Sequence, residues 1–135
     1  MQPESGTFTF IIPEPFDRAV RRLQSSVEGR GLRITLRIDL SQRVMRTLGI
    51  HLPPCLLLGV WPGEALASDL DPVAAVLLPL HLVVASRDSY TEIFVRSRIH
   101  PEDGPRAGRV RPGVIETQNA LLKSLDAVAM RPGVV

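Results

Sequence analysis

The segment Leu32–Asp39 reads Leu-Arg-Ile-Thr-Leu-Arg-Ile-Asp, and this strict alternation constrains the fold more than any other feature of the chain. Side chains of a β-strand point alternately to its two faces, so a period of two places every aliphatic residue of this segment on one face. The pattern therefore predicts a strand with one buried face and one wet face. Such a strand requires neighbouring strands to pair with and an apolar layer to cover it.

Four other segments have the composition of strands, namely residues 7–12, 55–60, 76–85 and 90–99. The first is stopped by Pro13, and the second is an aliphatic run before the turn-forming sequence Trp61-Pro62-Gly63. Within 76–85, Pro79 lacks the amide proton of a ladder bond, which predicts a bulge or a sheet edge there. The short polar link 86–89 predicts that 90–99 pairs back on 76–85 as a hairpin.

Helical periodicity occurs in two long segments and two short ones. Apolar residues recur every three or four positions over 16–28 and 114–130, which predicts amphipathic helices. Asp39 or Ser41 is expected to cap a short helix that Gly49 ends, and residues 64–70 favour another. The segment 100–113, rich in proline and glycine, is expected to be an exposed loop. This order predicts one α+β domain over residues 1–135, with an antiparallel or mixed sheet of about five strands and helices packed on one face.

Composition excludes several classes of protein. Hydrophobic residues make up 44% of the 135-residue chain and charged residues 22%, which is typical of one folded domain. The longest apolar run, 73–85, is shorter than the ~20 residues of a membrane-spanning helix. The first residues lack the pattern of a secretory signal, and the lone Cys55 has no disulfide partner, so we expect a reducing, cytoplasmic location.

Common motifs for catalysis and cofactor binding are missing from the sequence. His51, His81 and His100 are scattered and lack nearby histidine or cysteine partners, so no metal is expected. Neither a glycine-rich phosphate loop nor a Gly-x-Ser-x-Gly elbow occurs, so no nucleotide cofactor and no serine nucleophile are expected. Cys55 precedes three leucines, which favours a buried and unreactive thiol.

Arginine supplies nearly all of the positive charge, with Lys123 the only lysine and a net charge of +2. Arg33 and Arg37 share the polar face of one predicted strand, and Arg96 and Arg98 share a face of another. If the two strands were neighbours, these side chains would form a basic stripe able to bind an anion or a nucleic acid. Because the chain has only four Phe, one Trp and one Tyr for stacking on bases, a solvated face or a dimer contact is the favoured interpretation.

Several short stretches follow one another in an order and spacing typical of a known family. They are Ile38-Asp39-Leu40, Leu48-Gly49, Leu58-Gly59, Pro62, Asp71-Pro72 and Leu77-Leu78-Pro79. Over residues 16–99 the chain thereby resembles the domain of unknown function 302 family, which is bacterial and archaeal. The resemblance implies a compact homodimer and no established activity.

The chain departs from this family at two positions that bear on chemistry. Family members often have Cys-Asn-Pro and Pro-Cys-Asn where this chain has Val60-Trp61-Pro62 and Pro79-Leu80-His81. Both cysteine positions are therefore aliphatic here. Thiol or metal chemistry that depends on those cysteines is not expected in this chain.

A small-molecule site is predicted near Trp61, Pro62, Gly63 and His81. The turn 61–63 would follow a strand and precede a short helix at Glu64, so its amide groups would be free to bind an anion. His81 would lie nearby if the strands 55–60 and 76–85 are neighbours. The alternative is that Trp61 packs in the core and His81 makes one structural hydrogen bond.

These observations favour a non-enzymatic homodimeric domain that binds a small ligand or a partner, with no cofactor and no membrane segment. An enzyme of unrecognised class that uses His81 in a pocket near Trp61 is the alternative. Nucleic-acid or anion binding through the arginine-rich sheet face is the most distant hypothesis.

Overall fold

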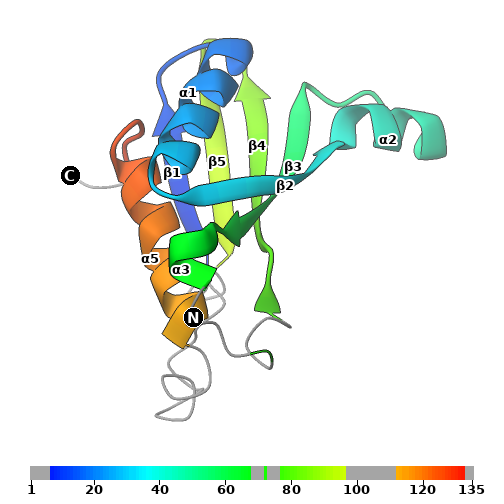
Figure 1. Cartoon of the computed structure of the whole chain (residues 1–135). Helices are drawn as coiled ribbons and strands as arrows, with labels where there is room; N and C mark the ends of the chain where they lie inside the picture. The colour runs from blue at the N-terminus through cyan, green and yellow to red at the C-terminus, as the bar shows by residue number, and fades with distance from the viewer. Residues whose placement is uncertain (1–6, 68–71, 73–76, 97–111, 133–135) are drawn as a thin grey trace, which may run out of the picture.

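The computed structural model describes residues 7–67, 72, 77–96 and 112–132. Within these ranges the strands are β1 (Thr7–Ile12), β2 (Leu32–Asp39), β3 (Cys55–Pro62), β4 (Leu80–Arg87) and β5 (Tyr90–Arg96). The helices are α1 (Phe16–Gly29), α2 (Leu40–Leu48), α3 (Glu64–Ala67) and α5 (Pro112–Asp126), as Figure 1 shows.

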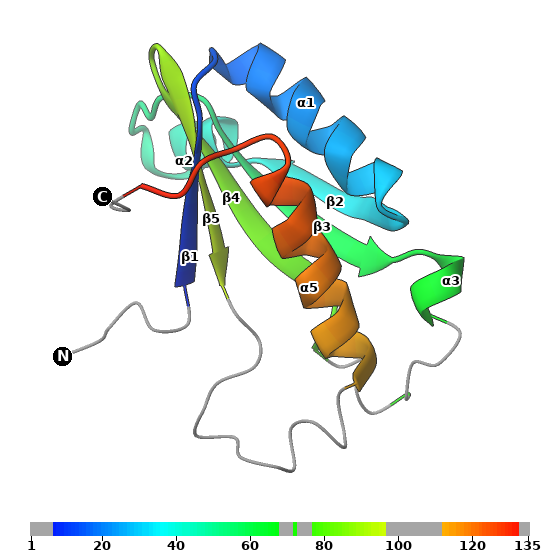
Figure 2. The ribbon, with the colours of Figure 1, turned by 90° about the vertical axis from the view of Figure 1, so that its left-hand side faces the viewer.

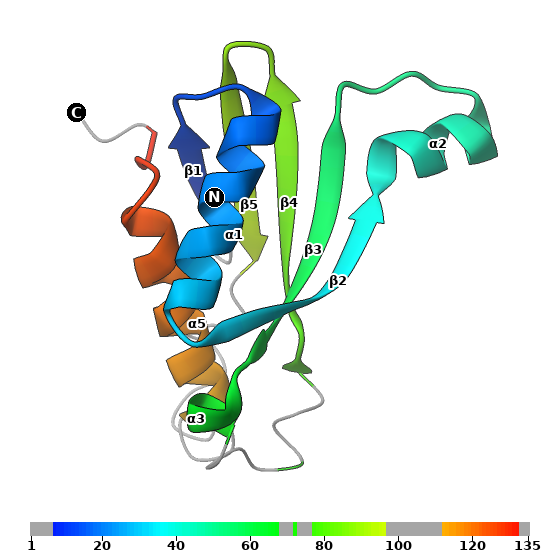
Figure 3. The ribbon, with the colours of Figure 1, turned by 45° about the horizontal axis from the view of Figure 1, so that its top comes forward.

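The strands join one antiparallel sheet in the order β1-β5-β4-β3-β2. The hairpin between β4 and β5 turns at Asp88 and Ser89, and Asp88 adopts a φ of 65°, a left-handed conformation that aspartate tolerates. α1 and α5 lie on the same side of the sheet and contact each other (Figure 2). The predicted α+β class is therefore confirmed, and the sheet, expected to be antiparallel or mixed with about five strands, is antiparallel with five. α2 lies beyond the β2 edge, away from these two helices (Figure 3).

The core lies between the sheet and the two long helices. Each helix buries the apolar stripe that its three- and four-residue spacing creates: Ala19, Val20, Leu23 and Val27 from α1, and Val114, Leu121 and Leu125 from α5. The sheet meets them with one residue in two from each central strand: Leu56, Leu58, Val60, Leu80, Leu82, Val84, Ile93 and Val95. A hydrogen bond from the Ser26 hydroxyl to the Ser124 carbonyl oxygen, at 2.7 Å, joins the two helices.

Two strands differ from the predicted boundaries at their prolines. β3 continues through Trp61 and Pro62 by pairing with β2, so the turn expected at 61–63 is instead the end of a strand. A proline is tolerated there because a strand end needs no further ladder bond. β4 begins at Leu80 and not at residue 76, because Pro79 has no amide proton to give to the ladder.

The closing helix is shifted toward the N-terminus relative to its predicted bounds. α5 begins at Pro112, inside the segment expected to be a loop, and ends at Asp126 rather than at residue 130. The chain then turns back, and Ile11 and Met130 exchange two backbone hydrogen bonds of 2.7 and 2.8 Å that cover part of the β1 edge.

Residues 100–111 of the expected loop, and the end of the expected helix 64–70, lie outside the described residues. In the part of the chain that is described, no helix has the length and hydropathy to span a bilayer.

Gly63 marks a close approach between the end of β3 and the start of β2. Its backbone N–H donates to the Gly31 carbonyl oxygen at 2.8 Å. A Cβ atom at Gly63 would lie 2.3 Å from that same oxygen. Only glycine fits here without moving the backbone.

We expect Gly63→Ala to lower the free energy of unfolding by roughly 1–3 kcal/mol, the usual cost of overpacking, because the opposing atom is backbone and cannot rotate away. Gly29→Ala is the matched control, since nothing lies within 4 Å of a Cβ atom at that position. That substitution should be neutral or stabilise by up to ~1 kcal/mol. Urea unfolding measures both variants, and equal stabilities would contradict the close approach.

Candidate functional site

The sheet face opposite α1 and α5 carries an apolar row that crosses four neighbouring strands. The strand register aligns Ile38 of β2 with Leu57 of β3, Leu57 with Val83 of β4, and Val83 with Phe94 of β5. All four side chains are half-buried, and none belongs to the core cluster on the helix side. We call these four residues the apolar row and the face that carries them the open face.

Trp61 and His81 both lie on the open face, at one end of it. β3 and β4 are neighbours, as expected, and His81 stands opposite Gly59, two residues before Trp61. Both side chains are half-buried, and Trp61 also packs against the core. The structure therefore brings the two predicted ligand-binding side chains onto adjacent strands of the same face, and their role in binding stays a prediction.

The backbone near Trp61 does not provide the free amide that the prediction placed at Gly63. The Gly63 N–H is already bonded to the Gly31 carbonyl oxygen, and Pro62 has no amide proton. In addition, α3 is only four residues long. The prediction that the amide groups of the turn 61–63 are free to bind an anion is therefore wrong at Pro62 and Gly63.

The predicted stripe of arginines from β2 and β5 does not form, for two reasons. β2 and β5 are separated by β3 and β4, so their arginines are not neighbours. A register shift between Ile34 and Leu36 then moves Arg37 to the helix side of the sheet, opposite Leu58. Arg33 stays on the open face opposite Trp61, Arg96 lies on that face near the β1 edge, and Arg98 lies outside the described residues.

α2 is a further candidate interaction surface that sequence reasoning did not identify. Asp39 caps the N-terminus of the helix, and its carboxylate accepts hydrogen bonds from the Gln42 backbone N–H at 3.0 Å and the Ser41 hydroxyl at 2.6 Å. The Ser41 hydroxyl and the Gln42 amide lower the pKa of Asp39 below its usual value. The capping prediction is thus confirmed for Asp39.

The apolar side of α2 is half-buried at Leu40, Val44 and Met45, and exposed at Leu48 and in the segment after the helix. No residue of the helix is buried, although its hydrophobic side chains lie on one side. Leu48, Ile50 and Leu52 are exposed by 65%, 50% and 43%. An amphipathic helix of a single domain normally buries such a side, which makes α2 a candidate contact surface.

The comparisons with known proteins place the chain in a family. The family "Domain of unknown function DUF302" matches residues 8–97, and the chain belongs to it. The solved structure "Crystal structure of uncharacterized conserved protein DUF302 from Bacillus stearothermophilus" has the same fold, with a TM-score of 0.73 at 15% identity. That alignment covers 91% of this chain and 98% of the other. No curated protein matches this chain.

Cys55 lies on the open face at the start of β3, where it is half-buried. Burial raises the pKa of its thiol above the ordinary value, and nearby Arg87 opposes that shift only in part. Because the thiolate is the reactive form, a raised pKa lowers the reactivity of the thiol near neutral pH.

We expect Cys55 to react with iodoacetamide more slowly than an exposed thiol at pH 8, with the difference shrinking as the pH rises through the raised pKa. A matched control is Ser89→Cys in a Cys55→Ser background, because Ser89 is exposed in the β4–β5 turn. Mass spectrometry follows the alkylation rates. Equal rates for the two thiols at pH 8 would rule out the shielding, and denaturant should abolish the difference.

Proposed function

We propose that this protein is a non-enzymatic homodimeric binding domain whose open face contacts a second copy of the chain. The apolar row carries the proposal, because four aligned aliphatic and aromatic side chains on one sheet face form a contiguous apolar surface outside the core. Surfaces of this kind mark interaction sites in soluble proteins. A sheet face can also bind a second copy of itself, because two sheets can stack face to face.

The size of the open face supports a dimer that includes α2. Five strands about 4.8 Å apart and three side-chain rows roughly 7 Å apart give a planar area of roughly 500 Å². A standard stable interface buries about 800 Å² on each partner. In Figure 2, α2 lies on the side of the sheet opposite α1 and α5, so the exposed Leu48, Ile50 and Leu52 can supply the remaining area.

The charges beside the apolar row favour a second copy over an unrelated partner. On the open face of β5, Phe94 stands between Glu92 and Arg96. A two-fold axis along the apolar row would stack Phe94 on Phe94 and place each Glu92 opposite Arg96 of the second copy. Glu92 is already oriented by the Arg87 Nε, which donates to it at 2.8 Å, and Arg96 is exposed. The two reciprocal pairs would form at the rim of the interface, where charges set specificity.

A small-ligand site at the Trp61 end of the same face is the second candidate. It is favoured by the placement of Trp61 and His81 on adjacent strands of the open face. In the described ranges, no three His, Cys, Asp or Glu residues group together as a metal site would require.

We expect the wild-type chain to have the mass of a dimer by light scattering at micromolar concentration and Val83→Lys to have the mass of a monomer, because the lysine would bury a charge at the centre of the row. Asn119→Lys, on the exposed side of α5, is the matched control and should remain dimeric. A monomeric wild type would overturn the proposed dimer. A dimeric Val83→Lys variant would place the interface elsewhere.

We expect Glu92→Arg and Arg96→Glu, made singly, each to raise the dimer dissociation constant about tenfold or more, because each turns two attractive pairs into repulsive ones. The double variant should recover most of the affinity, because the pairs re-form with reversed signs. Glu116→Arg, an exposed reversal on α5, is the control and should have little effect. Sedimentation at 50 mM and 500 mM salt tests the charge dependence. Failure of the double variant to recover would contradict this two-fold arrangement without excluding a dimer.

A further inference from the structure

A second surface, on the helix side of the molecule, has the chemistry of an anion site. An open groove of about 490 Å³ lies along α1, lined by Arg18, Arg21, Arg22, Ser25, Ser26 and Val128. The five α1 residues recur at the three- and four-residue spacing that places side chains on one side of a helix. Val128, from the turn after α5, supplies an apolar wall.

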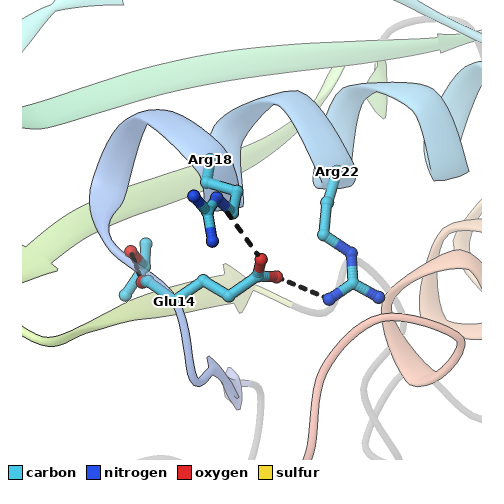
Figure 4. Close-up of polar contacts among 4 residues, drawn as sticks. Glu14, Arg18 and Arg22 are labelled. Atoms are coloured by element: carbon cyan, nitrogen blue, oxygen red, sulfur yellow. Dashed lines mark hydrogen bonds and ion pairs between the residues drawn. The ribbon is translucent and has the colours of Figure 1, made fainter.

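Glu14 pairs with two of the three arginines (Figure 4). Its carboxylate accepts a hydrogen bond from Arg22 Nη1 at 2.5 Å and lies 4.0 Å from Arg18 Nε. The Glu14 backbone is itself anchored, because its carbonyl oxygen accepts a hydrogen bond from the Thr91 hydroxyl at 3.0 Å. Thr91 is fully buried, so the Glu14 backbone is held against the core and its carboxylate orients Arg22 by a hydrogen bond.

The remaining polar groups give the groove a surplus of positive charge and free donors. Three arginines line the groove and Glu14 pairs with two of them, so these four side chains together carry a net charge of +2. Within the described chain Arg21 has no acidic partner, and each of the other two arginines keeps donors that Glu14 does not occupy. Ser26 gives its hydroxyl proton to Ser124, which leaves the exposed Ser25 as the hydroxyl donor.

The geometry points to a phosphate monoester as the ligand of this groove. A dianionic phosphoryl group matches the charge surplus and can accept hydrogen bonds from several guanidinium groups at once, which arginine favours over a point charge. The ester group would lie against Val128. Arg131 is not part of the site, because Asp126 holds it at 3.1 Å and it stacks over Phe10. The site is independent of the open face, so it extends the proposed function and does not rest on it.

Titration of the full-length chain with phenyl phosphate, followed by isothermal calorimetry or by amide NMR shifts, tests this assignment. We expect phenyl phosphate to bind more tightly than inorganic phosphate, because only the ester contacts Val128. Arg21→Gln and Ser25→Ala should each weaken binding at least about fivefold, since each removes donors without disturbing Glu14. Arg22→Lys should also weaken it, because a lysine cannot both hold Glu14 and donate in a fork.

Arg46→Gln is the matched control, because Arg46 is an exposed arginine on α2, far from the groove, and this variant should bind as the wild type does. Vesicles that contain phosphatidic acid distinguish the two sources of a phosphate monoester: binding that requires Arg21 would identify a lipid headgroup, and binding of phenyl phosphate alone would identify a soluble ligand. Binding by Arg21→Gln equal to that of the wild type, or no binding to either probe, would overturn the site. Circular dichroism confirms that each variant is folded.

Discussion

The structure depends on one constraint, which is that a five-stranded sheet has two faces and the two long helices cover only one of them. The middle of each central strand is a continuous apolar run, namely 56–58 in β3, 82–84 in β4 and 93–95 in β5, so both faces of the sheet are apolar there. α1 and α5 bury the residues of one face to zero or nearly zero exposure. The other face retains Leu57, Val83 and Phe94 outside that core. This difference between the two faces is the reason for proposing a partner that covers the open face.

Most elements were predictable because the information that defines them is local. Alternation alone marks β1 and β2, and a four-residue and three-residue spacing marks α1. The cap at Asp39 and the stop at Gly49, which adopts a φ of 69°, are equally local. The predictions that were wrong depended on contacts between residues far apart in the sequence. The register shift that sends Arg37 to the helix side arises from how β2 pairs with β3, and the strand order that separates β2 from β5 is a property of the whole sheet.

The candidate sites also divide into features that the local sequence predicts and features that only the pairing of distant segments creates. The proximity of Trp61 and His81 was predictable because consecutive strands tend to pair. The bond from Gly63 to Gly31 was not, because those residues meet only when β2 and β3 are in register. The arginine groove also escaped prediction. The spacing of Arg18, Arg22 and Ser25 is visible in the sequence, but Glu14 and Val128 approach them through the sheet and the chain reversal after α5.

The two proposed surfaces meet at β5, although they lie on opposite sides of the sheet. Thr91 points to the helix side, where its hydroxyl holds the Glu14 backbone and so sets the position of Arg22. Glu92, the next residue, points to the open face, where the proposed dimer would hold it. Neighbouring residues of one strand cannot shift independently, because they share a backbone paired on both sides. The two proposed surfaces therefore share one paired backbone segment, in which Thr91 supports the arginine groove from the helix side and Glu92 belongs to the open face.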